Sequence, residues 1–441
     1  MLRAPHSCLI FVLTTCLNVL VFLPATAQSV VSERALRRVV GELAGDAMRG
    51  RSVGDGSVLA ARYLEKQFQR AGLQPLPGAA SFAQEFTVYQ SRSQELTVSL
   101  NGQPIDHSHS VLLPGQPSFS WTATQARPPR LLVVPAGVPL RPYVDSVFKA
   151  QQDLLVLVHP DHSRWFNSLV AHYWSNSQYS LTPPDPFSVV LLLTTDTKAT
   201  SFSVSGRTSV RPVQLRNVVG VLPGRDPAHR NEQVIFSAHY DHLGIRPAVQ
   251  GDSIANGADD DASGTAAVVA LARYYHKRHD NARTLVFVAF TAEEVGGFGA
   301  EYFSRQLQPR QVAAMLNIEM IGTPAKFGLR SAFVTGFEKS DLGAILQRNV
   351  PATAFRFEPD PYPDQYLFYR SDNYKLAQLG IPAHTISTVQ LPSATYYHTV
   401  DDEIANLNFS NMRAVVQAIA AGAASLVSGQ STPTRLAPGT P

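Results

Sequence analysis

Cysteine is nearly absent from this chain of 441 residues, which contains only Cys8 and Cys16. Both lie within the first 27 residues, a segment that we expect to be removed. The rest of the chain then has no cysteine and forms no disulfide, which suits an oxidising compartment, where free thiols react. The scarcity of cysteine therefore excludes a disulfide-stapled fold and is compatible with a location outside the cytoplasm.

The sequence also lacks a strong excess of charge of one sign. Its formal net charge is +3, and no run of Lys and Arg is long enough for a nucleic-acid groove. Hydrophobic residues make up 44% of the chain and charged residues 16%, which is enough for a large core in two or three domains. We therefore expect no nucleic-acid partner.

Long apolar runs are equally scarce, and the one that approaches membrane-spanning length covers residues 8–23. Arg3 precedes it, and the small residues Ala25-Thr26-Ala27 follow it. This order predicts a signal peptide over residues 1–27, cleaved before Gln28. A membrane anchor is the alternative, but the run is short for a membrane-spanning helix and polar residues interrupt it. We expect a secreted or periplasmic protein with no integral membrane segment after cleavage.

Periodicity divides the remainder into four segments. Residues 28–94 begin with two expected helices, the first capped by Ser32. Residues 95–212 are rich in proline and strand-like runs and have weak helical periodicity, which predicts an inserted β-rich, lid-like domain. Residues 213–428 alternate between strands and helices and would form the catalytic domain. Residues 429–441 form a tail rich in Pro, Thr and Gly that we expect to be disordered.

The alternation in residues 213–428 predicts the fold class. Apolar runs such as QVIFSAH, TLVFVAF and MLNIEM are expected strands, and expected helices at about 263–279 and 409–427 separate or follow them. Such alternation is typical of a mostly parallel sheet with helices on both faces. We predict a three-layer α/β sandwich with a mostly parallel central sheet, plus the inserted domain.

Six side chains of metal-ligand type lie at the ends of these expected strands or beside expected helices. They are His239, Asp260, Glu293, Glu294, Glu319 and His398. Four of them follow apolar strand runs directly. Open α/β sheets place their ligands in the crevice beyond the carboxyl ends of the strands, so we expect these side chains to lie together.

Imidazole and carboxylate in this ratio suit a pair of divalent cations that share one carboxylate. Two such cations, roughly 3.5–4 Å apart, lower the pKa of a shared water and polarise an amide carbonyl. A nearby carboxylate must then take the proton of the water and pass it to the leaving amine. In an adjacent Glu-Glu pair, one side chain can bind metal while the other transfers this proton.

Each motif has an ordinary explanation when it is taken alone. A His-x-Asp is often a surface feature, three acids before Ala-Ser-Gly are often a helix cap, and a Glu-Glu pair is usually a solvated helix face. The histidines scattered through residues 95–212 are interpreted as ordinary surface or core residues. The joint occurrence of the six residues, in order and at strand ends, favours a metal site.

At these residues the sequence resembles the secreted two-zinc aminopeptidases, a group related to glutamate carboxypeptidase and to glutaminyl cyclases. The resemblance covers residues 215–425 and extends to GELAGDAMRGRSVGDGSVLAARYLEKQFQRAGLQP. NVVGVLPGRDPAHRNEQVIFSAHYDHLG is similar to the group's segment that leads to the metal. The resemblance implies a zinc exopeptidase-like fold, peptide substrates and two Zn²⁺, although oxygen-rich sites also accept Mn²⁺ or Co²⁺.

The resemblance also implies two sets of ligands that share one carboxylate. The ligands of the first zinc would be His239, Asp260 and Glu319. Those of the second would be Asp260, Glu294 and His398. Glu293 would be the general base, and Asp241 would lie behind His239 and fix its tautomer. Four flanking residues would support the ligands without binding metal, namely His242, Asp259, Asp261 and Asp402.

Three positions depart from the group's usual pattern. Glu319 stands where Asp is usual, and its longer side chain can reach a metal while altering metal preference or occupancy. Asn373 stands where His is common, and we expect it to have a structural or substrate-facing role. The tyrosine that stabilises the oxyanion in relatives has Tyr369 as its candidate here, with Tyr366 and Tyr396 as further candidates.

We predict a zinc-dependent exopeptidase, an aminopeptidase first of all, with Glu293 as general base. A carboxypeptidase is an alternative, since it would share the same core. A glutaminyl cyclase-like enzyme would keep one zinc and lack the first imidazole, which His239 supplies here. A non-catalytic binding module is the alternative from another class, and the intact base and ligand set weigh against it. The sequence leaves open the side chain preferred at the cleaved residue and the oligomeric state.

Overall fold

The computed structural model describes residues 31–437. The predicted signal peptide, with Cys8 and Cys16, lies outside this range, as do residues 438–441. Within residues 31–437, no helix is both long enough and apolar enough to cross a membrane.

Four parallel strands form the centre of the main sheet, in the order β13-β10-β14-β17. They are β10 (Gln233–His239), β13 (Thr284–Phe290), β14 (Val312–Ile318) and β17 (Ala383–Ser387). Each is a short run of mostly apolar residues, as strands buried on both faces require. The predicted α/β sandwich is confirmed, with a mixed sheet whose four central strands are parallel.

On each side of this centre the next strand runs in the opposite direction. On the β13 side the sheet continues into β9 (Phe202–Leu222), β1 (Ala83–Leu100) and β2 (Gln103–Pro104). On the β17 side it continues into β15 (Ser331–Val334) and β16 (Arg356–Pro359). The flanks of the sheet are therefore mixed, while the parallel centre carries the strand ends at which the predicted ligands lie.

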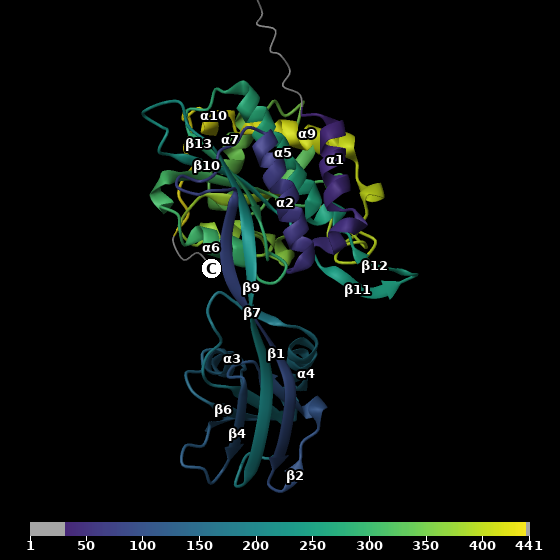
Figure 1. Ribbon diagram of the computed structural model, residues 1–441, viewed down its shortest axis with the longest axis vertical. Helices are drawn as coiled ribbons and strands as arrows, with labels where there is room; N and C mark the ends of the chain where they lie inside the picture. The colour runs from purple at the N-terminus through teal and green to yellow at the C-terminus, as the bar shows by residue number, and fades with distance from the viewer. Residues whose placement is uncertain (1–30, 438–441) are drawn as a thin grey trace, which may run out of the picture. The chain divides into compact units, whose positions relative to one another are not determined.

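Alternate residues of the central strands face two separate cores. Val234 and Phe236 of β10 belong to the larger core, whereas Ile235 between them belongs to the smaller core. The helices that bury residues in the larger core include α1 (Glu33–Leu43), α2 (Asp55–Arg70), α5 (Gly264–Arg278), α7 (Leu342–Arg348), α9 (Phe409–Gly422) and α10 (Ala424–Val427). Those in the smaller core are α6 (Phe298–Ser304) and α8 (Asn373–Ala377). These two helical layers enclose the sheet (Figure 1).

The helices predicted by periodicity are present. Ser32 caps α1 as expected, because its side-chain oxygen accepts a hydrogen bond from the backbone N–H of Ala35 at 3.4 Å. The helix expected at about 409–427 is divided into α9 and α10. A short two-stranded sheet, β11 (Gly244–Val249) and β12 (Asp252–Ala255), follows the end of β10.

The insert has its own four-stranded sheet, in the order β3-β8-β6-β5. Its strands are β3 (Ser110–Leu113), β5 (Arg130–Val134), β6 (Leu154–Val158) and β8 (Val189–Leu193), while β4 (Ser118–Thr122) pairs with β9 and β7 (Gln178–Ser180) with β1. It also contains two helices that weak periodicity did not predict, α3 (Arg141–Phe148) and α4 (Ser163–Ser175). In α4 only Phe166 and Leu169 are buried, so the apolar spacing of this helix is faint.

The boundaries predicted for the insert do not coincide with loops. β1 and β9 pair as one antiparallel ladder from Ala83↔Val218 to Leu100↔Phe202. The predicted boundaries after residues 94 and 212 both fall inside this ladder. The two strands therefore run without a break from the main sheet into the insert.

The disorder predicted for the tail is wrong as far as the structure describes it, up to residue 437. Leu436 is 4% exposed and belongs to the smaller core, and its N–H donates to the carbonyl of Gly380 at 3.2 Å. Arg435 donates from Nη1 to the carbonyl of Val312 at 2.7 Å. The composition of the tail indicated disorder because it does not reveal these few anchoring contacts.

Candidate metal centre and catalytic site

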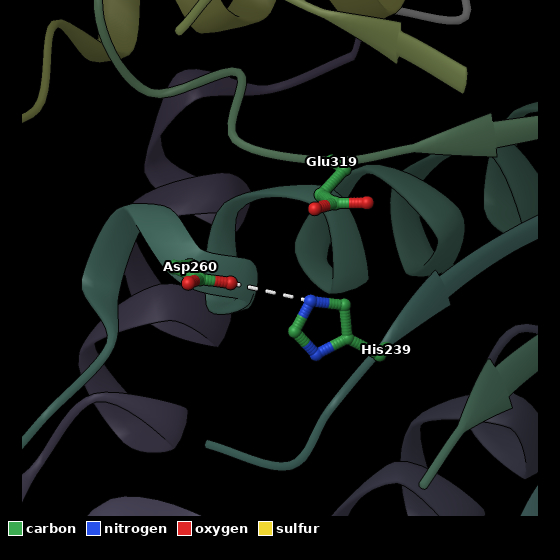
Figure 2. Close-up of side chains that lie close together, drawn as sticks. All are labelled: His239, Asp260 and Glu319. Atoms are coloured by element: carbon green, nitrogen blue, oxygen red, sulfur yellow. Dashed lines mark ion pairs between the residues drawn. The ribbon is translucent and has the colours of Figure 1, made fainter. Parts of the chain in front are cut away.

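The carboxyl ends of β10, β13 and β14 lie next to one another, because β10 pairs in parallel with both neighbours. His239 is the last residue of β10, and Glu319 directly follows β14. Asp260 lies in the turn of residues 258–263 that leads into α5. Figure 2 shows these three side chains converging from the three segments.

Asp260 presents each of its oxygens to a different imidazole. Oδ1 lies 3.2 Å from Nε2 of His239, and Oδ2 lies 3.2 Å from Nε2 of His398. The same nitrogen of His398 lies 3.2 Å from Oε2 of Glu294. The Asp260 side chain is 3% exposed and that of His398 38% exposed, so the arrangement opens to solvent on the His398 side. This is the geometry expected of a carboxylate that bridges two cations.

The environment of His239 leaves a buried lone pair that faces carboxylates. Nδ1 lies 3.1 Å from the main-chain carbonyl of Asp241, and a carbonyl only accepts, so Nδ1 carries the proton. Nε2 is then an acceptor, and it is buried without a hydrogen bond. One ligand atom from each of His239, Asp260 and Glu319 lies within 4.8 Å of the other two. Converging buried acceptors without donors fit a cation.

The expected role of Asp241 needs a correction. Its carboxylate lies 3.8 Å from Nδ1 of His239, farther than its own main-chain carbonyl, which makes the contact with the imidazole. The carboxylate instead accepts the backbone N–H of Glu293 at 3.2 Å and that of Glu294 at 3.3 Å. Asp241 therefore positions the turn that carries both glutamates.

The two adjacent glutamates have different surroundings. The Glu294 side chain is 6% exposed, and its Oε1 lies 2.8 Å from Nδ1 of His242 while its Oε2 faces His398. Glu293 lines a cavity of about 450 Å³ together with Asp260 and Glu319. Both glutamates line this cavity, but Glu294 contacts two imidazoles, whereas Glu293 belongs to neither set of converging ligand atoms.

The flanking residues support the candidate ligands through hydrogen bonds. Asp402 accepts the backbone N–H of Asp259 at 2.9 Å and of Asp260 at 3.0 Å. Asp261 accepts the N–H of Gly264 at 2.9 Å and of Met320 at 3.0 Å. His242 is closer to the site than the sequence indicated, since His242, Asp260 and Glu294 form a second set of converging ligand atoms.

Glu319 is held by a chain of side chains that the sequence analysis did not identify. The hydroxyl of Ser371 donates to Oε2 of Glu319 and accepts from Nδ2 of Asn317 at 2.8 Å. The hydroxyl of Ser237 donates to Oδ1 of Asn317 at 2.8 Å. The longer carboxylate therefore has a fixed position in place of the shorter one that is usual in the resembling group.

Asn373 has the structural role that was one of its two expected roles. It is fully buried, and its Nδ2 donates to the carbonyl of Phe368 at 3.0 Å. Its Oδ1 accepts from the hydroxyl of Thr385 at 2.8 Å. The side chain thus fixes the segment before it to the middle of β17.

The tyrosine candidates differ in their access to the cavity. Tyr369 lines it, whereas Tyr366 is 67% exposed and Tyr396 donates its hydroxyl to Oδ2 of Asp259 at 2.7 Å. Tyr397, which the sequence analysis did not consider, also lines the cavity and stacks on His398 with ring centroids 3.8 Å apart. Tyr369, Tyr374 and Tyr397 are thus the tyrosines that line the cavity, and Tyr397 is the one that contacts His398.

The site concentrates negative charge. Burial, with nearby carboxylates, raises the pKa of Glu293 well above its usual range and that of Glu319 to about 7. Burial raises the pKa of Asp372 to about 8, and neither of its oxygens has a hydrogen bond. Burial opposes ionisation of Asp260 too, but contacts with His239 and His398 hold its pKa well below the usual value. Cations bound here would neutralise this surplus of carboxylates.

Arg51 is a fully buried residue near the site that the sequence did not single out. Its guanidinium donates to five main-chain carbonyls, those of Leu43, Tyr240, Asn256, Gly257 and Asp260, at 2.5–3.3 Å. Burial lowers the pKa of Arg51, and the surrounding acids offset this effect. Arg51 thereby connects the end of α1 to the segment after His239 and to the segment that contains Asp260.

We expect Arg51→Met to lower the free energy of unfolding by about 3 kcal/mol or more, because it leaves several buried carbonyls without a donor. Arg62→Met, at an exposed position of α2, is the matched control and should change it little. Urea denaturation of both variants measures the difference. Equal stability of the two variants would contradict a positioning role for Arg51.

Comparison with known proteins places the site in a family context. The model of Peptidase family M28 matches residues 217–423. A probable zinc metalloprotease of Leptosphaeria maculans is 35% identical over 114 residues, which cover 25% of this chain and 26% of the relative. A probable leucine aminopeptidase of Trichophyton verrucosum is 29% identical over 210 residues, which cover 44% of this chain and 52% of the relative. The chain thus spans about a quarter to a half of the length of these curated relatives.

Solved structures resemble the fold over most of its length. An aminopeptidase from Aneurinibacillus sp. strain AM-1 has a TM-score of 0.56 and 18% identity, with 93% of this chain and 97% of the other covered. BSAP, a zinc aminopeptidase from Bacillus subtilis, has a TM-score of 0.53 and 16% identity, with 91% and 97% covered. At these identities the likeness concerns the fold.

Proposed function

We propose that this chain is a zinc-dependent exopeptidase, an aminopeptidase that releases one residue from peptides outside the cytoplasm, because residues 217–423 match the model of Peptidase family M28. The observation that carries the proposal is the position of Asp260, with each oxygen 3.2 Å from a different imidazole. Because Nδ1 of His239 carries the proton, its Nε2 offers Asp260 no donor, and a cation between the two would satisfy both side chains.

Two Zn²⁺ fit the donor atoms of the site. His239 and Glu319 would hold one ion, His398 and Glu294 would hold the other, and Asp260 would be shared. His242 donates to the second oxygen of Glu294 in this proposal and orients that carboxylate. Oxygen-rich sites of this kind also accept Mn²⁺ or Co²⁺.

The residues around the cavity supply the remaining chemistry. When bound, paired divalent cations acidify a water and polarise the amide carbonyl. Glu293 takes the proton from the attacking water and delivers it to the leaving amine. Tyr397 donates its hydroxyl proton in a hydrogen bond to the carbonyl oxygen as negative charge develops there, with Tyr369 as the second candidate. Burial raises the pKa of Tyr397, so its hydroxyl stays protonated.

The insert of residues 95–212 is proposed to act as a lid on this site. Tyr179 and Leu181 of the insert pack in one apolar cluster with Val295 and Phe298, which follow the two glutamates. The lid would therefore contact the segment that directly follows the general base, Glu293.

Metal analysis of the purified protein, together with hydrolysis of a panel of aminoacyl-p-nitroanilides, tests the proposal. We expect about two Zn²⁺ per chain and cleavage of substrates with a free α-amine but not of N-acetylated ones. His239→Ala should reduce bound zinc towards one per chain, whereas His159→Ala, in the insert, should leave it unchanged. A wild-type content near one zinc, or none, would contradict the paired-metal assignment. Cleavage of blocked substrates alone would contradict aminopeptidase activity.

A further inference from the structure

We propose that Arg370 anchors a carboxylate of the peptide substrate, a role that rests on the proposed function of the site. Arg370 lines the cavity of about 450 Å³ that contains the ligands, and also a smaller neighbouring pocket of about 40 Å³. Glu319, Ser371 and Tyr397 line both as well. Arg370 thus lies where the two spaces meet, next in sequence to Ser371, which contacts Glu319.

The charge of Arg370 is not used within the part of the chain that the structure describes. Lys375, another cation of the larger cavity, pairs with Glu301 at 3.0 Å, and His398 contacts two carboxylates. Arg370 is exposed and forms no ion pair with residues 31–437, and its side chain makes one long hydrogen bond, 3.4 Å from Nη1 to the carbonyl of Gln365. Most of its five N–H donors are therefore available to a ligand.

The backbone that carries Arg370 is fixed to the catalytic site. Its N–H donates to the carbonyl of Leu367 at 3.1 Å, and the next residue, Ser371, donates its hydroxyl to Glu319. Asn373 holds the carbonyl of Phe368 from the other side. The backbone of Arg370 therefore has a defined position relative to Glu319, as it would not have on a loop without such hydrogen bonds.

A planar guanidinium matches a carboxylate, which it can bind through two parallel hydrogen bonds. A peptide offers a carboxylate in two places. An acidic side chain on the first residue would enter the smaller pocket, whose walls combine the hydroxyl-bearing Thr335, Thr385 and Ser387 with apolar side chains such as Phe333 and Val389. The terminal carboxylate of a dipeptide would instead remain in the larger cavity. Either carboxylate would form the same pair with Arg370, and substrates that differ in only one of the two carboxylates distinguish which one is bound.

Two pairs of substrates, each differing in one carboxylate, test the anchor. The first pair is Glu-p-nitroanilide and its isostere Gln-p-nitroanilide, and the second is Ala-Ala and Ala-Ala-amide. We expect wild-type protein to prefer the acidic member of one pair. Arg370→Gln should reduce that preference, measured as the ratio of kcat/KM values, on the order of ten- to hundredfold, mainly through KM. Arg370→Lys, which keeps the charge but not the fork, should retain part of it.

Arg310→Gln, at an exposed position before β14, is the matched control and should leave both ratios unchanged. Thermal melting of each variant establishes that it is folded. The anchor is overturned if wild type prefers neither acidic member, or if Arg370→Gln changes both members of a pair by the same factor. If the wild type hydrolyses none of these four substrates and does not hydrolyse Leu-p-nitroanilide, the proposed function itself is contradicted, and the anchor with it.

Discussion

Glu293→Gln is expected to reduce turnover by about 10²- to 10⁴-fold, the contribution usual for a general acid–base group. Glutamine keeps the size of the side chain but cannot take a proton from water. Glu293 lines the cavity without belonging to either set of converging ligand atoms, so its replacement should leave bound metal unchanged. Steady-state kinetics and metal analysis of the same preparation measure both quantities.

Two further variants distinguish proton transfer from a general loss of structure. Glu338→Gln, at a position 75% exposed, should leave turnover and metal content unaltered. Glu294→Gln should lower metal content, because this residue is assigned to a metal. The assignment of the base is wrong if Glu293→Gln retains wild-type activity, or if it loses metal as Glu294→Gln does.

Removal of metal is expected to abolish activity and to make stability depend strongly on pH. Burial raises the folded-state pKa of Asp241 to about 6, of Glu319 to about 7 and of Asp372 to about 8, from ordinary values of 3.8 and 4.5. A raised folded-state pKa means that the protonated acid favours the fold. In the metal-free protein this contribution is complete below about pH 4, declines as the pH rises above the ordinary pKa values, and is lost once the pH has passed the folded-state values of about 6 to 8.

Bound cations remove this dependence, because they stabilise the ionised carboxylates in the folded state. Thermal melting of chelated and zinc-loaded protein at pH 5 and at pH 8 checks the prediction. The zinc-dependent increase in Tm should be clearly larger at pH 8. Equal increases at the two pH values would contradict the view that the buried acids require a cation.

The sequence was sufficient to predict that these side chains lie together, because strand ends have a simple geometry. His239 and Glu319 each end an apolar run of about seven residues, and parallel pairing brings such ends to one edge of the sheet. Asp260 was identifiable because an acid lies directly before a long helix. Local pattern and global topology coincide at these positions.

Other features depend on contacts between distant segments and leave no local pattern. Arg51 lies in a turn rich in glycine and charge, and only the fold shows that it meets carbonyls about 200 positions away. Tyr397 was overlooked because nothing in its neighbourhood distinguishes it from Tyr396, whose hydroxyl turns to Asp259. The composition of residues 429–441 predicted disorder, yet Leu436 is buried in the smaller core and holds this part of the tail against the fold.

The central claim is that two cations lie on either side of Asp260. Anomalous diffraction at the zinc absorption edge, from crystals of protein purified without chelator, tests it directly. The account predicts two peaks roughly 3.5–4 Å apart, one beside His239 and Glu319 and the other beside His398 and Glu294. A map without peaks at these side chains, or with a single peak that Asp260 does not contact, would contradict it.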